Sequence, residues 1–194
     1  MREDMKGFVS MILILLLSAA LGCGPSLGRT IALPEVPAGG AAAVRPVTAG
    51  TLLFIDEVKD VRAENALVGY AGKNINADRE VSPVVREALE KAFKGRGFTI
   101  SDSAPIIVTG EVKNWFANVR GGLPGSVDSN ASIQIDVFDP ANKRIFSGNY
   151  QGSAALETPS VDERDIRGAL GTAMSEAISQ ILADQQLIEL LASF

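Results

Sequence analysis

The chain has 194 residues, of which 46% are apolar and 21% are charged, a composition typical of a globular protein with a core. Lys and Arg total 18 against 23 Asp and Glu, and the net charge of -5 disfavours nucleic acid as a partner. The sequence has no histidine and a single cysteine, which excludes disulfide frameworks, Cys/His zinc sites and imidazole-based catalytic triads.

The N-terminus has the features of a secretory signal. Arg2 and Lys6 precede an uninterrupted apolar run from Met11 to Leu17. The apolar segment 7–22 is shorter than the about 20 residues that a membrane-spanning helix needs. The sequence therefore predicts a signal peptide over residues 1–22.

The signal ends in the sequence SAALGC at residues 18–23, which resembles a bacterial lipobox with Ala20 in the place of the usual leucine. The resemblance implies cleavage before Cys23 and acylation of its thiol, so that several acyl chains, palmitate among them, anchor the protein stably. Gly24 follows in place of an aspartate, which implies sorting to the outer membrane. The alternative is an ordinary signal peptide that contains an unmodified cysteine.

The mature chain is predicted to have two parts. Residues 23–50 are rich in proline and glycine and are interpreted as a lipid-anchored flexible linker, in which segment 30–33 is compatible with an edge strand. Residues 51–194 are predicted to form a single α+β domain.

The first half of this domain alternates strand and helix. Residues 52–55 form a short apolar run typical of a buried strand, and a polar connection with room for a small hairpin follows. Ser82 and Pro83 provide an N-cap and a first-turn proline for a helix over residues 83–94. Residues 96–100 then turn the chain into a second strand.

From Ile106 the apolar pattern has a period of two, which predicts a half-buried strand. One face of this strand carries Ile106, Val108, Val112 and Phe116, and the other carries Thr109, Glu111, Lys113 and Trp115. Alternating residues at 133–137 and a return through 144–150 complete an antiparallel meander, because turn sequences separate the three segments.

The C-terminal segment has a helical stripe of apolar residues at Ile166, Ala169, Leu170, Ala173, Met174, Ala177, Ile178, Ile181 and Leu182. A short terminal helix is predicted over residues 187–194. The predicted fold class is α+β, with a mostly antiparallel sheet of four to five strands and two main helices packed on one face.

This order of elements resembles the YajG-type lipoproteins of Gram-negative envelopes from residue 52 to the C-terminus. The resemblance is carried by LFID at 53–56 with DVR at 60–62, by VREALEK at 85–91 with RGF at 96–98, and by the final helix before DQQ at 184–186. It implies an outer-membrane lipoprotein and supplies no catalytic residues. A related layout is similar to auxiliary lipoproteins of ABC-type lipid transporters.

Trp115 and Phe116 are the candidate partner-binding residues. The strand pattern places Trp115 opposite Val108 and Val112, and an aromatic side chain on an uncovered sheet face is a suitable binding anchor. The alternative is that Trp115 simply covers neighbouring strand residues.

Three carboxylates, Asp56, Glu57 and Asp60, lie near a strand end and are compatible with acid/base chemistry, although a solvated loop is the simpler interpretation. Patterns that imitate a calcium loop at 128–139 and a phosphate loop at 69–74 both fail at required positions. No metal and no cofactor are expected.

The sequence therefore predicts a non-enzymatic outer-membrane lipoprotein, anchored on the periplasmic side, whose domain binds an envelope protein of unknown identity. One alternative is an auxiliary subunit of an ABC-type lipid or solute transport system, which a continuous apolar groove between helix and sheet would favour. Another is a hydrolase that works through carboxylates, which a deep pocket with converging Asp and Glu would favour.

Overall fold

The computed structural model describes residues 30–37 and 51–194. The predicted signal peptide and Cys23 lie outside these residues. The strands are β1 (Thr30–Ile31), β2 (Leu52–Asp60), β3 (Ala66–Tyr70), β4 (Lys73–Ala77), β5 (Thr99–Ile100), β6 (Ile107–Arg120), β7 (Gly125–Phe138) and β8 (Arg144–Thr158); the helices are α2 (Val81–Gly95), α3 (Glu163–Ala183) and α4 (Gln185–Ala192).

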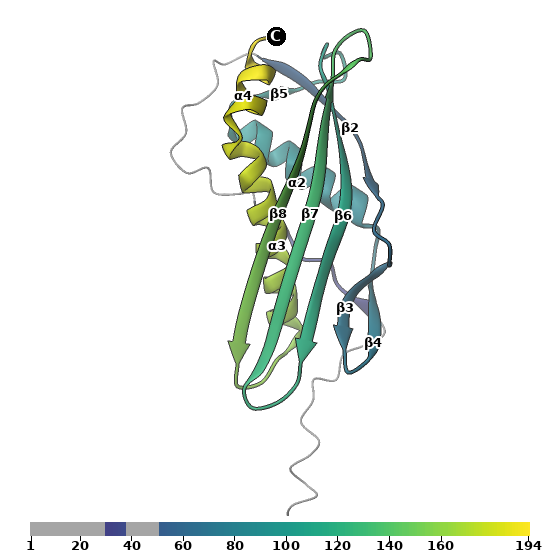
Figure 1. The fold of residues 1–194 in the computed structure, drawn as a ribbon, viewed down its shortest axis with the longest axis vertical. Helices are drawn as coiled ribbons and strands as arrows, with labels where there is room; N and C mark the ends of the chain where they lie inside the picture. Colours follow the sequence, from purple (N-terminus) through teal and green to yellow (C-terminus); the bar gives the residue numbers. More distant parts are fainter. Residues whose placement is uncertain (1–29, 38–50) are drawn as a thin grey trace, which may run out of the picture.

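The described strands form one eight-stranded mixed sheet around β6 (Figure 1). β6 pairs along its length with β7, and β7 pairs with β8, both antiparallel. On its other edge β6 pairs in parallel with β2 and then, further along, with β3. β5 extends the sheet beside β2, whereas β4 and β1 extend it beside β3.

The predicted sheet of four to five mostly antiparallel strands is therefore wrong. Within the described residues, parallel pairing joins β1 to β4, β2 to β5, and β6 to both β2 and β3. Each of these pairs connects strands that are separated by other elements. The meander of β6, β7 and β8 was predicted correctly, because turn sequences mark its local connections.

The helices lie together on one side of the sheet (Figure 1). α3 begins with a capping box, in which the Asp162 side chain accepts from the Asp165 backbone N–H and the Asp165 side chain accepts from that of Asp162. Its predicted apolar stripe is confirmed, since every residue of that stripe is buried. Asp184 ends α3 and caps α4, where its side chain accepts from the backbone N–H of Leu187.

Part of the predicted linker belongs to the fold. In segment 30–37, the side chains of Ile31 and Leu33 are each 2% exposed and that of Val36 is 8% exposed. β1 pairs with β4, and the backbone N–H of Leu33 donates to Asp78 Oδ1 at 3.0 Å. β1 thus forms the edge strand with which segment 30–33 was judged compatible. The linker interpretation does not hold for segment 30–37 as a whole, because its proline-rich composition masked three core side chains.

Among the described residues, no helix has both the length and the apolar character needed to cross a membrane.

Candidate interaction surface

A β-bulge in β6 reverses the side-chain alternation that the sequence predicted. Val112 lies opposite Ile133 and Asn114 lies opposite Ser132, so Lys113 is an extra residue in β6. Trp115 therefore points toward the helices and is 0% exposed. Its predicted exposed position is wrong, because a strict period of two does not reveal an inserted residue.

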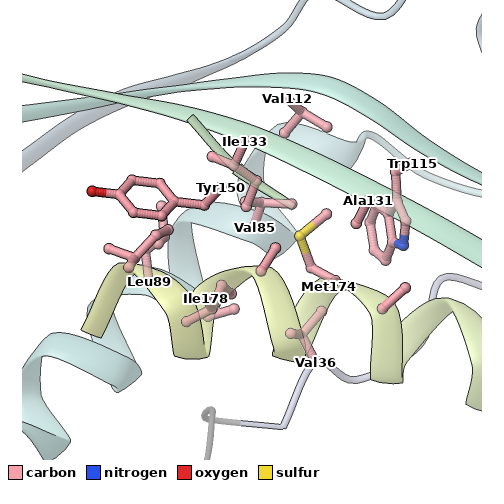
Figure 2. Close-up of a cluster of buried hydrophobic side chains, with 14 of the residues drawn as sticks. Val36, Val85, Leu89, Val112, Trp115, Ala131, Ile133, Tyr150, Met174 and Ile178 are labelled. Atoms are coloured by element: carbon pink, nitrogen blue, oxygen red, sulfur yellow. The ribbon is translucent and has the colours of Figure 1, made fainter. Parts of the chain in front are cut away.

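Trp115 is part of the core between β6 and α3 (Figure 2). Its Nε1 donates to the main-chain oxygen of Leu170 at 3.0 Å. Met174 lies near the indole, and Ile133 occupies the same layer further along. These side chains belong to the core that packs α3 on the sheet.

Arg62 holds the bulged part of β6 in place from the side of β2. Its Nε and Nη2 donate to the two carboxylate oxygens of Asp60, each at 2.8 Å. Its Nη1 donates to the main-chain oxygens of Ala66 and Trp115, each at 3.3 Å. The Arg62 side chain is only 5% exposed, so this fork is a structural connection among three strands.

Among the three candidate carboxylates of β2, Asp60 has a structural role that Asp56 and Glu57 do not share. The hydrogen bond from the Arg62 guanidinium lowers the pKa of the Asp60 carboxyl below its ordinary 3.8. Asp56 and Glu57 are exposed at a register shift in β2 between Ile55 and Val58. No group of three or more Asp, Glu, His or Cys side chains that could hold a metal ion occurs within the described residues.

The sheet face that points away from the helices is polar over β6, β7 and β8; we call it the amide face. It carries Thr109, Glu111, Asn114, Asn118, Asp128, Asn130, Ser132, Gln134, Asp136, Asn149, Gln151 and Ser153. Phe116 belongs to this face, opposite Asn130 of β7, and its ring covers Gly69 of β3. A Cβ on Gly69 would lie 2.7 Å from Phe116 Cζ, so a side chain there would displace the ring.

A hollow of about 550 Å³ lies where the amide face meets the outer edge of β8 and α3. It is lined by Asn114, Asn130, Ala131, Ser132, Gln151, Gly152, Ser153, Glu176 and Gln180. Glu176 Oε2 accepts from the backbone N–H of Ser153 at 2.7 Å, and Gln180 Oε1 accepts from that of Gln151 at 3.4 Å. The side chains of α3 thus cap the outer edge of β8 and close one side of the hollow.

This surface carries many hydrogen-bond donors and acceptors and the ring of Phe116. Amide and hydroxyl groups both donate and accept, so they match polar groups on a partner without a requirement for opposite charge. Phe116 was predicted on the face of Val108 and Val112 and lies instead on the opposite face. The rest of the amide face could have been found from the sequence, because every second residue of β7 and β8 there is polar.

The fold occurs in another bacterial protein. Protein XCC0632 from Xanthomonas campestris matches with a TM-score of 0.54 and 13% identity over 84% of this chain and 96% of that chain, which shows a shared fold. A putative lipoprotein from Caulobacter crescentus has a TM-score of 0.43 and 18% identity, over 71% and 92% of the two chains. A minor lipoprotein from Acinetobacter baumannii has a TM-score of 0.40 and 9% sequence identity, and the match covers 76% of this chain and 94% of that chain.

The sequence comparison defines the family. No curated protein matches the chain. The sequence model of a family described as "Uncharacterized lipoprotein" matches residues 50–192, which is most of the chain. The chain belongs to this lipoprotein family.

Proposed function

We propose that this protein is a YajG-type outer-membrane lipoprotein, anchored through acylated Cys23 on the periplasmic side, and that its domain binds another envelope component without catalysing a reaction. Membership of a lipoprotein family carries this proposal. The lipobox-like sequence at residues 18–23 supports the anchor, since it places the single cysteine directly after a signal peptide. The amide face supports a binding role.

The anchor is tested by labelling cells with radioactive palmitate and separating their inner and outer membranes on a density gradient. The parent protein is expected to be labelled and to sediment with the outer membrane. The Cys23→Ser variant is expected to be unlabelled and to leave the outer-membrane fraction. A labelled Cys23→Ser variant, or an unlabelled parent that still sediments with this fraction, would exclude acylation at Cys23 as the anchor.

The binding role is assigned to the amide face because this surface combines an aromatic ring with a polar hollow. Phe116 is half-buried, so a partner covers additional ring surface without requiring the domain to unfold. Asn114, Asn130 and Gln151 lie on three adjacent strands and surround the hollow from the same side. A rigid sheet holds these groups in place, which lowers the entropy lost on binding.

The partner contact is tested with a photo-crosslinking amino acid introduced at Asn130 in intact cells. The matched control carries the same amino acid at Glu189, an exposed position on α4. A discrete adduct is expected from position 130 and not from position 189, and Phe116→Ala is expected to reduce its yield. Identical adducts from both positions, or an adduct unaffected by Phe116→Ala, would contradict the assignment.

A further inference from the structure

The tether between Cys23 and the fold is short, because β1 belongs to the sheet. Only residues 24–29 separate Cys23 from Thr30, the first residue of β1. A fully extended chain of this length spans at most about 25 Å. If Cys23 is acylated, as the proposed function states, the domain is held close to the lipid surface.

The direction of β1 shows which end of the domain faces the tether. β1 runs parallel to β4, and Thr30 pairs with Asn76 near the end of β4. β4 starts at Lys73, directly after the turn that joins it to β3. The chain that leads into Thr30 therefore arrives from the side of the β3–β4 turn.

The turn between β6 and β7 lies at this same end (Figure 1). β3 runs parallel to β6 with Tyr70 opposite Val119, and the Tyr70 hydroxyl would lie 3.2 Å from a Cβ on Gly121. Leu123 lies further along, in the turn itself. The β6–β7 turn thus projects at least as far toward the tether as the β3–β4 turn.

Leu123 is an apolar side chain at the tip of this turn and is 86% exposed. Among the exposed large apolar residues of the described chain, the next is Phe194, the last residue, at 55%. The turn at the opposite end of β7, residues 139–143, has the polar sequence DPANK. An apolar tip is therefore present on the tethered end of the meander, where burial in lipid removes it from water.

The charges at the tethered end are mixed. Lys73, Arg120 and Arg164 are exposed there, but so are Glu157 and Glu163. Arg120 also lies 3.4 Å from Asp128, and Arg164 lies 2.8 Å from Asp162. This end consequently offers no excess of basic groups for anionic headgroups, so contact with lipid depends on the apolar tip.

We propose that the β6–β7 turn inserts Leu123 into the lipid leaflet that holds Cys23. The long strands β6, β7 and β8 then stand away from the membrane, and the β7–β8 turn and α4 face the periplasm. The short tether keeps Leu123 at a high local concentration near the lipid leaflet, so this single leucine is sufficient for contact. The amide face stays accessible from the side.

The test uses the full acylated protein reconstituted in phosphatidylcholine vesicles, with Leu123→Cys labelled by a polarity-sensitive fluorophore. Because the acylated Cys23 has no free thiol, the label is confined to position 123. Its emission is expected to shift to shorter wavelength and to lose most of its intensity when the lipid chains carry a nitroxide quencher. Adding anionic phosphatidylglycerol is expected to leave both values unchanged.

The matched control is Ala141→Cys in the β7–β8 turn, which is also exposed and is expected to emit as in water. Vesicle flotation separates the two proposals. If the parent does not float, the lipid anchor fails; if it floats and position 123 emits like position 141, the insertion of Leu123 is overturned. Burial of the label by a protein contact is recognised by a shift that persists in detergent micelles without quenching by nitroxide lipids, and this outcome also overturns the proposal.

Discussion

Trp115 and Leu170 join the sheet to its longest helix by a hydrogen bond inside the core. The indole Nε1 donates to the Leu170 main-chain oxygen at 3.0 Å. The main-chain oxygen of Trp115 accepts at 3.3 Å from Nη1 of Arg62, whose side chain is 5% exposed. The bulged segment of β6 is therefore held both by a helix and by the connection that follows β2.

Trp115→Ala is expected to lower the free energy of unfolding by about 3–5 kcal/mol, because it leaves a cavity in a close-packed core. Phe116→Ala is the matched control, since the neighbouring ring is only half-buried, and a loss of about 1–2 kcal/mol is expected there. Urea denaturation followed by circular dichroism measures both. Equal losses for the two variants would contradict the inward orientation of Trp115.

Arg62→Lys is expected to lower the free energy of unfolding by about 3 kcal/mol, because an ammonium group cannot replace the planar fork that binds both oxygens of Asp60 and two main-chain oxygens. Arg120→Lys is the control. Arg120 pairs with Asp128 at 3.4 Å, with side chains 70% and 43% exposed, so a change below about 0.5 kcal/mol is expected. Similar urea midpoints for both variants would show that the Arg62 hydrogen bonds contribute no more to the free energy of unfolding than the exposed Arg120–Asp128 pair.

The Asp60 carboxyl gives a pH-dependent prediction. Because the hydrogen bond from Arg62 lowers its pKa in the folded state below the ordinary 3.8, the unfolded state binds a proton there more readily. The stabilisation is fully present above the unfolded pKa and is lost as the pH falls through the folded pKa. The stability difference between parent and Asp60→Asn is therefore expected to be largest at neutral pH and to shrink below about pH 4.

Urea midpoints of the two proteins at a series of pH values measure this difference directly. The acidic residues that both proteins share contribute equally, so they cancel in the comparison. A difference that stays constant across the acidic range would show that the carboxylate of Asp60 is no more stable in the folded protein than in the unfolded chain.

The sequence predicted elements whose signals are local. The stripe from Ile166 to Leu182 repeats at helical spacing, and the turns that flank β7 separate the strands of the meander. The inward orientation of Trp115 was not predicted, because Lys113 is an ordinary residue with no mark of the bulge that it creates. Only pairing with β7 reveals the extra residue.

The parallel strand pairs could not be predicted from the sequence either, because no local signal marks them. β2 and β6 are separated in the chain by β3, β4, α2 and β5, and no turn sequence connects them directly. Segment 30–37 was interpreted as part of a linker, with an edge strand compatible at 30–33, because its prolines outweighed Ile31, Leu33 and Val36 in the composition. The candidate surface was found only in part, since its polar residues become one face when three strands are aligned side by side.

Gly152 of β8 and Gly168 of α3 provide a matched pair of substitutions, because Gly152 touches α3 and Gly168 is exposed. A Cβ on Gly152 would lie 2.0 Å from the Ala173 main-chain oxygen and 2.6 Å from the Ala177 nitrogen, so Gly152→Ala forces β8 and α3 apart. We expect a loss of about 3 kcal/mol or more in the free energy of unfolding. A Cβ on Gly168 in α3 meets nothing within 4 Å, so Gly168→Ala is expected to stabilise the protein by about 0.5–1 kcal/mol through helix propensity. Thermal unfolding of both variants distinguishes the two effects. A tolerated Gly152→Ala protein would show that α3 does not pack on β8 at this distance, and a destabilised Gly168→Ala protein would show that position 168 is not in open space.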